Sequence, residues 1–149
     1  MSVPPRTVVV PVTGGTGDKR ILDLLGRLLE RTSTSIVLVY VLEVMQSMSL
    51  DAELPQEVSH GEGVLAEAER YAQGQVAKNV RLQTVTTEIL QARAAGAAIV
   101  DEAIDRHADA IAMSASLRIV HGRATIGDTS DYVLKNAPCE VILVREPLD

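Results

Sequence analysis

Five short runs of mostly apolar, β-branched residues recur along the chain, and they limit its fold more than any other feature of the sequence. Such runs are typical of strands whose two faces are both buried, as in a parallel sheet covered by helices. Between the runs, apolar residues recur at the three- and four-residue spacing of amphipathic helices. The five expected strands are Thr7–Val12, Ser35–Leu42, Val80–Leu90, Asp109–Ser114 and Glu140–Arg145.

The segments between these runs predict helices and one long loop. Asp18 is placed to cap the start of the first helix, and Pro138 stops the last one. Glu43–His60 has no steady periodicity and is expected to be a loop. The expected helices are Asp18–Arg31, Gly61–Lys78, Ala94–His107 and Gly127–Asn136.

Strands that alternate with helices predict an α/β fold with right-handed crossovers and helices on both faces of the sheet. For five parallel strands we expect a doubly wound sheet in the order 3-2-1-4-5, in one domain over residues 1–149. In that order the ligand crevice lies between the carboxyl ends of the first and fourth strands. The residues that matter for binding are then the turn from Thr13 to Gly17 and the segment from Ser114 onward.

The amino-acid composition indicates what the core is made of, which partners are disfavoured and in which compartment the protein is expected. The chain contains no Phe or Trp, so its core must consist of Val, Ile, Leu and Ala. A formal charge of −6 disfavours nucleic acid and anionic membranes as partners. The single cysteine, Cys139, cannot form an internal disulfide, and no run approaches the roughly 18 apolar residues that span a bilayer. We expect a soluble, cytoplasmic protein without direct membrane insertion.

The glycine-rich turn after the first strand is a weak phosphate-binding signal. Gly14-Gly15-Thr16-Gly17 is not a complete P-loop, and Arg20 stands where a dinucleotide fingerprint needs its last glycine. A flexible strand-to-helix turn is the preferred interpretation. The alternative is that Thr16 and the turn amides hold an anion or a small polar ligand, with Lys19 and Arg20 adding charge.

The segment from Asp109 to Arg145 resembles the carboxyl-terminal signature of the universal stress protein family. It contains a strand ending in Met113, a loop, Gly127 opening a helix, then the sequences DYVL (131–134) and APC (137–139) and a Val-rich last strand. The first strand, Val9–Val12, is also similar to that of the family, whereas agreement is weaker over Glu43–His60. The resemblance implies an adenine nucleotide alpha hydrolase-like fold and a role in the stress response. It also implies ATP with Mg²⁺ as the ligand of those members that bind nucleotide, and association with transporters for some members.

ATP-binding members of the family carry a loop of the form Gly, two residues, Gly, nine residues, Gly, then Ser or Thr. The matching positions here are Ser114, Leu117, Gly127 and Asp128, so one of the three glycines remains and a carboxylate replaces the hydroxyl group. Leu117 hinders close backbone approach to a phosphate, and Asp128 is expected to complement the helix dipole where a phosphate would bind. Thr13 stands where the family has its adenine-contacting Asp.

The altered loop favours a non-catalytic regulatory protein that needs no cofactor and acts through an unknown protein partner or ligand. The alternatives are an ATP-binding protein with weak ATPase activity and a cytoplasmic sensor associated with a transporter. The candidate residues of the ligand crevice are Val12, Thr13, Gly14, Gly15, Ser114, Ala115, Leu117, Gly127, Asp128 and Thr129.

The last strand is expected at an edge of the sheet, where its free backbone groups invite pairing with another chain. In a symmetric pair the strand meets its own copy in antiparallel fashion, and universal stress proteins commonly dimerise in this way. We therefore expect a homodimer. The edge-strand residues expected to form the dimer interface are Val141, Ile142, Leu143 and Val144.

No residue in the sequence is placed for catalysis or metal binding. The histidines His60, His107 and His121 are scattered and lack ligand spacing, although His121 and Arg123 are candidates to contact an anion in the crevice. Cys139 has no neighbouring base in sequence, and Ser114 lies outside any Gly-x-Ser-x-Gly motif. We predict no catalytic residue and no metal site.

Overall fold

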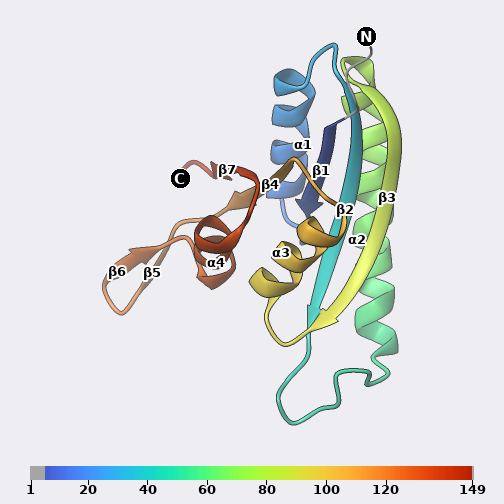
Figure 1. Ribbon diagram of the computed structural model, residues 1–149. Helices are drawn as coiled ribbons and strands as arrows, with labels where there is room; N and C mark the ends of the chain where they lie inside the picture. Colours follow the sequence, from blue (N-terminus) through green and yellow to red (C-terminus); the bar gives the residue numbers. More distant parts are fainter. Residues whose placement is uncertain (1–5, 149) are drawn as a thin grey trace.

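The computed structural model describes residues 6–148. Figure 1 shows a sheet flanked by helices, with a small hairpin to one side. The elements in chain order are β1 (Arg6–Pro11), α1 (Gly17–Leu28), β2 (Ser33–Glu43), α2 (Pro55–Gly74), the 3-10 helix η1 (Val76–Lys78), β3 (Arg81–Ala92), α3 (Ala95–Asp105), β4 (Ala110–Ala115), β5 (Arg118–Val120), β6 (Arg123–Thr125), α4 (Asp128–Asn136) and β7 (Glu140–Arg145).

The main sheet has five parallel strands in the order β3-β2-β1-β4-β7. With β7 counted as the fifth strand of this sheet, the order agrees with the predicted 3-2-1-4-5. The chain builds one half of the sheet outward from β1 to β3 and then crosses back to add β4 and β7 on the other side. The strand order therefore reverses between β1 and β4, which is where ligands bind in sheets of this type.

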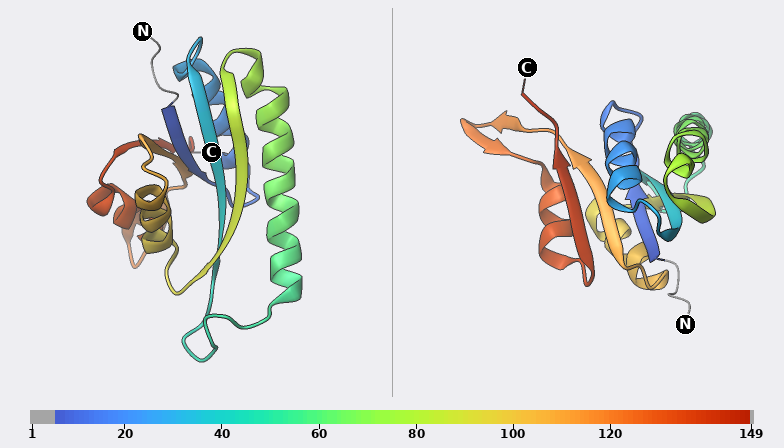
Figure 2. Two further views of the ribbon diagram at one scale, coloured as in Figure 1. Left: turned by 45° about the vertical axis from the view of Figure 1, so that its right-hand side comes forward. Right: turned by 90° about the horizontal axis from the view of Figure 1, so that it is seen from above.

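Helices cover both faces of the sheet, α1 and α2 on one and α3 and α4 on the other (Figure 2). Successive side chains of β1 alternate between the two faces. Val8 and Val10 pack in the core under α1 and α2, while Val9 packs in the core under α3 and α4. Each is at most 1% exposed, and burial of such a side chain contributes about 1.5–3 kcal/mol.

The long segment after β2 was predicted to be a loop as far as His60, and this prediction is wrong in its last part. Helix α2 begins at Pro55, and the Val58 amide donates to the Leu54 carbonyl oxygen at 2.8 Å. Proline suits the first turn of a helix because its missing N–H has no partner there and its φ is already helical. The helix ends at Gly74, and η1 completes the segment to Lys78.

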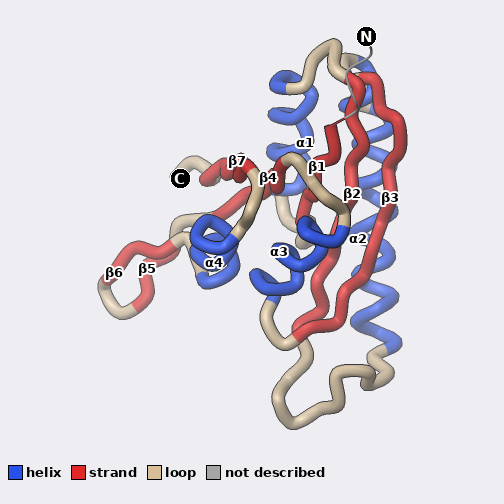
Figure 3. The backbone as a smooth tube through the Cα atoms, in the orientation of Figure 1, coloured by secondary structure: helices blue, strands red, loops and turns tan. Residues whose placement is uncertain are grey.

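The segment between β4 and α4 contains an antiparallel hairpin, β5–β6, that the sequence analysis did not predict. Its turn is His121-Gly122, and both residues have positive φ, 52° and 76°. Such a two-residue turn suits the right-handed twist of a hairpin. The hairpin projects away from the main sheet (Figure 3). Within residues 6–148, no helix is both long and apolar enough to cross a membrane.

Candidate functional site

A cavity of about 540 Å³ opens at the carboxyl ends of β1 and β4, where the strand order reverses. The first residues of α1 and α3 contribute Gly17 and Ala95, and the first turn of α4 contributes Thr129 and Ser130. The volume lies in the range of about 300–1,000 Å³ typical of small-molecule sites. We refer to this cavity as the crevice.

The structure brings together part of the predicted candidate set. Gly14 does not line the crevice. It faces the opposite side of the β1–α1 turn and lines a neighbouring cavity between α1 and α2. Leu117, Gly127 and Asp128 line neither cavity. The candidates that line the crevice are Val12, Thr13, Gly15, Ser114, Ala115 and Thr129.

The geometry does not support the expectation that Asp128 takes the place of a phosphate. Asp128 is the first residue of α4, its side chain is exposed, and it forms no side-chain hydrogen bond with any residue between 6 and 148. It still lies near the positive end of the helix dipole. The carboxylates that line the crevice belong to Glu43 and Glu146, neither of which the sequence analysis named as a site residue.

Glu146 directly follows β7 and bridges two elements across the crevice. Its Oε2 accepts a hydrogen bond from Ser116 Oγ at 2.7 Å, and its Oε1 accepts one from Thr16 Oγ1 at 3.0 Å. Its amide donates to the Ala115 carbonyl oxygen at 2.8 Å. The Ser116 and Thr16 hydroxyl groups, together with the charge of Arg20, hold the pKa of the Glu146 carboxyl below its usual value.

The start of α1 packs directly on the end of β4. A Cβ placed on Gly17 would lie 2.1 Å from Ser114 Oγ and 2.8 Å from Ser114 Cβ, so this position admits only glycine unless the backbone moves. Ser114 stands where ATP-binding relatives of the predicted family have the first loop glycine. The Ser114 side chain therefore occupies space between β4 and α1 that a glycine would leave open.

Three backbone amides of the turn between β1 and α1 already have hydrogen-bond acceptors. The Thr13 amide donates to Asp18 Oδ1 at 3.0 Å, the Gly14 amide to Asp18 Oδ2 at 2.8 Å, and the Gly15 amide to Thr13 Oγ1 at 3.3 Å. Asp18 thus holds the turn and does not cap α1, contrary to the prediction. These three amides are not free to cradle an anion.

The electrostatic environment of Asp18 is set mainly by its burial, which raises the pKa of this carboxyl above its usual value. The hydrogen bonds from the Thr13 and Gly14 amides act in the opposite direction, and the negative charge of Glu146 adds to the increase.

Arg118 is the cation of the crevice. Its Nη2 lies 3.1 Å from the position that a Cβ on Gly127 would occupy, and the φ of Gly127 is +95°, a value that favours glycine. The guanidinium group therefore covers the residue that precedes α4. The other charged residues that line the crevice are Glu43 and Glu146. Two carboxylates and one guanidinium give the lining a net charge of −1.

The remaining candidate residues lie apart from one another. His60 is in α2, His107 follows α3, and His121 is in the hairpin turn. Cys139 is half-buried, and burial raises the pKa of its thiol. Within residues 6–148, no group of three or more His, Cys, Asp and Glu side chains is placed to hold a metal ion.

Comparison with known proteins gives a family and a fold. The model of the Universal stress protein family matches residues 5–145. None of the curated protein sequences compared with the chain matches it.

Several solved structures of universal stress proteins superpose on almost the whole chain. The protein from Archaeoglobus fulgidus in complex with dAMP has a TM-score of 0.69 at 14% identity and covers 96% of this chain and 99% of its own. The UspA protein from Lactobacillus plantarum has a TM-score of 0.65 at 24% identity, covering 97% and 100%. A family member from Arabidopsis thaliana with AMP bound has a TM-score of 0.64 at 15% identity, covering 97% and 94%. At these identities the similarity establishes the fold alone.

Proposed function

The chain belongs to the universal stress protein family, and from this premise we propose that it is a non-catalytic regulatory member whose nucleotide crevice is closed by its own side chains. It acts in the stress response by binding a protein partner, as a homodimer. The observation that carries this proposal is the Glu146 carboxylate, bonded to Ser116 and Thr16 across the crevice.

Three features oppose the binding of phosphate groups. The Thr13, Gly14 and Gly15 amides of the β1–α1 turn are already hydrogen-bonded to Asp18 and Thr13. The hydroxyl groups of Ser116 and Thr16 donate to Glu146, so a phosphate must displace that carboxylate to reach them. The charged lining residues sum to −1, which repels an anion.

A titration of ATP with Mg²⁺, ADP, AMP and cyclic AMP into the protein, followed by calorimetry, tests the closed crevice. We expect no binding at micromolar strength and no ATP hydrolysis. The variant Glu146→Gln removes the charge and is expected to bind at least about tenfold more tightly than the wild type. Glu53→Gln, which removes an exposed carboxylate outside the crevice, is the matched control and should behave like the wild type. Micromolar binding by the wild type would contradict the proposal.

The edge of the sheet supports the homodimer. β7 pairs with β4 on one side, and no described strand pairs with its other side. Its four central apolar residues, 141–144, remain half-buried and not fully buried in the single chain. Antiparallel pairing of β7 with its copy would satisfy the free backbone groups and bury these side chains further.

Sedimentation of the variants Ile142→Asp and Val144→Asp tests this edge. A charge in the paired strand is expected to convert the dimer into a monomer. Thr84→Asp, on the exposed part of the opposite edge strand β3, is the matched control and should leave the dimer intact. Because Ile142 and Val144 also pack on the core, thermal unfolding must show that the variants are folded. Folded variants that remain dimeric would exclude β7 as the interface.

A second candidate function is adenine-nucleotide binding with slow ATP hydrolysis. The size of the crevice and the presence of Arg118 beside the start of α4 favour it. Solved relatives are described in complex with dAMP and with AMP. The titration above distinguishes the two functions, since this candidate requires the wild-type protein to bind.

A further inference from the structure

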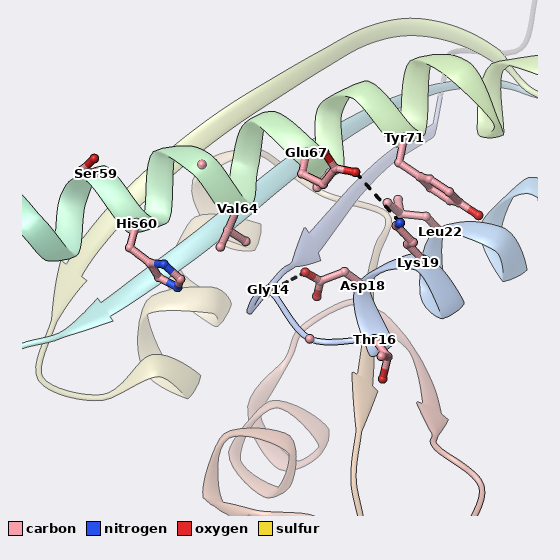
Figure 4. Close-up of a pocket in the computed structure, with 13 residues that line it drawn as sticks. Gly14, Thr16, Asp18, Lys19, Leu22, Ser59, His60, Val64, Glu67 and Tyr71 are labelled. Carbon is pink, nitrogen blue, oxygen red and sulfur yellow. Dashed lines mark hydrogen bonds and ion pairs between the residues drawn. The ribbon is translucent and has the colours of Figure 1, made fainter.

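A second cavity, of about 520 Å³, lies between α1 and α2 (Figure 4). It shares Gly15 and Thr16 with the crevice, so the β1–α1 turn forms the wall between the two spaces. Nothing in the proposed function uses this cavity. We refer to it as the interhelical cavity.

Missing side chains leave the interhelical cavity open. Gly63 lies in the first half of α2, and a Cβ placed on it would meet no atom within 4 Å. By contrast, a Cβ on Gly61 would lie 2.7 Å from the Tyr40 ring, so that glycine is required by close packing. No such contact explains Gly63, and glycine inside a helix destabilises the helix relative to alanine. Gly63 is exposed and lines the interhelical cavity, so the missing side chain leaves open space at this part of the cavity wall.

The base of the cavity is apolar and belongs to the main core. Leu22 of α1 is fully buried and Ala68 of α2 is 4% exposed. Val64 packs beside them and points toward Gly14 (Figure 4). These side chains offer a surface for the apolar body of a ligand.

The charges around the cavity are arranged asymmetrically. At one end Lys19 lies 4.0 Å from Glu67 and 5.5 Å from the centre of the Tyr71 ring, and Glu67 also pairs with Arg70. Asp18 lies between Gly14 and Lys19 in the middle of the cavity wall (Figure 4), forms no ion pair with any residue between 6 and 148, and accepts hydrogen bonds from the amides of Thr13 and Gly14. The charged residues in the lining are Asp18, Glu67 and Lys19, which sum to −1.

We propose that the interhelical cavity binds a small organic cation, with its apolar body over Leu22, Val64 and Ala68 and its ammonium group hydrogen-bonded to the Asp18 carboxylate. Each Asp18 oxygen accepts one hydrogen bond from the turn and retains a lone pair for a ligand. An ammonium group would donate a charge-assisted hydrogen bond to this carboxylate, and such bonds are roughly twice as strong as those between neutral groups. Burial raises the pKa of Asp18, and a cation bonded to the carboxylate would act in the opposite direction.

Phenethylamine is a suitable probe because it joins one aromatic ring to one primary ammonium group. Titration followed by amide NMR shifts should give saturable binding, with the largest shifts at Gly14, Lys19 and Gly63. Phenethyl alcohol and phenylacetate share the ring but lack the cation. We expect both to bind roughly ten- to a hundredfold more weakly, the discrimination of one hydrogen bond to a charged group.

The variant Gly63→Leu tests the site without disturbing the core, because its side chain enters open space. It should weaken phenethylamine binding at least about tenfold while unfolding at the same or a higher temperature. Gly74→Leu, at the other end of α2 and also without neighbours within 4 Å, is the matched control and should bind like the wild type. Asp18→Asn should remove the preference for the amine over the alcohol, provided that the variant is folded.

Four results would overturn the proposal: no saturable binding of the amine, equal binding of all three probes, unchanged binding by Gly63→Leu, or shifts confined to the crevice around Met113 and Ala115. None of these results bears on the nucleotide titration, because the residues that define the cation site lie on the α1–α2 side of the turn.

Discussion

Gly17, the first residue of α1, packs against Ser114 of β4, and the substitution Gly17→Ala tests this packing. The new methyl group would lie 2.8 Å from Ser114 Cβ, an atom that rotation of the serine side chain cannot move. The start of α1 must then shift away from β4. Overpacking of this kind costs about 1–3 kcal/mol, which lowers the melting temperature of a chain of this size by about 2–12 °C.

A double-mutant cycle with Ser114→Gly isolates this contact. Ser114→Gly removes two of the three atoms that the new methyl group would meet, and the third, Glu146 Oε1 at 3.0 Å, ends a flexible side chain that can move. The second substitution should therefore recover most of the stability lost in Gly17→Ala. We expect a coupling free energy of at least about 1 kcal/mol in chemical denaturation, above the roughly 0.5 kcal/mol scatter of independent sites. Gly74→Ala, a helical glycine without neighbours, is the control and should be neutral or stabilising. Full tolerance of Gly17→Ala, or a coupling within the scatter, would refute the packing of α1 on β4 described above.

The other two predictions concern ionisable groups. Since the pKa of Glu146 is lower in the folded state than its usual 4.5, its hydrogen bonds stabilise the protein above that pH and lose this effect as the pH falls through the folded-state pKa. The difference in unfolding free energy between wild type and Glu146→Gln, measured by denaturant titration, should therefore shrink in acid; a difference independent of pH would contradict these hydrogen bonds. The Cys139 thiol should react with iodoacetamide at pH 8 more slowly than a free cysteine, because burial raises its pKa; a rate equal to that of the unfolded protein would contradict its packing.

The strands and their order were predictable because both depend on simple rules. The three central strands, β2, β1 and β4, are covered on both faces, so each contains a continuous apolar run that can be recognised without knowledge of its neighbours. Once the runs alternate with helices, right-handed crossovers leave few possible orders. The last strand was predicted at Glu140–Arg145, and β7 has these bounds.

The missed elements depend on local backbone geometry and not on hydrophobic periodicity. The first turn of α2 contains Pro55 and few apolar residues, so the periodicity that identified the rest of the helix is absent there. The β5–β6 hairpin has the exposure of a loop, since residues 118–124 are all exposed. Its one local signal is the His121-Gly122 pair, in which a residue other than Asn or Asp takes the positive φ of the first turn position.

The register of β4 and β7 explains why Glu146 lies at the crevice. Parallel pairing sets Ala115 of β4 opposite Arg145 of β7, so the residues that follow each strand, Ser116 and Glu146, must lie side by side at the carboxyl edge of the sheet. In the comparison with the phosphate-binding loop, the sequence analysis considered the positions from Ser114 to Asp128 and therefore expected Asp128 to be the carboxylate at the phosphate position. Extending the comparison to the end of the neighbouring strand would have identified Glu146.

The distribution of hydrogen-bond donors also limits how any anion can enter the crevice. On the β1 side, the turn amides are bonded to Asp18 and Thr13, and the Thr16 hydroxyl group is bonded to Glu146. On the β4 side, the Ser116 hydroxyl group is also bonded to Glu146. The Arg118 guanidinium and the start of α4 lie together at Gly127, and neither is bonded to Glu146. A phosphate that enters without displacing Glu146 finds its cation on the α4 side, so Arg118→Ala should weaken any residual nucleotide affinity of the wild-type protein, whereas Glu146→Gln should open a separate position between α1 and β4.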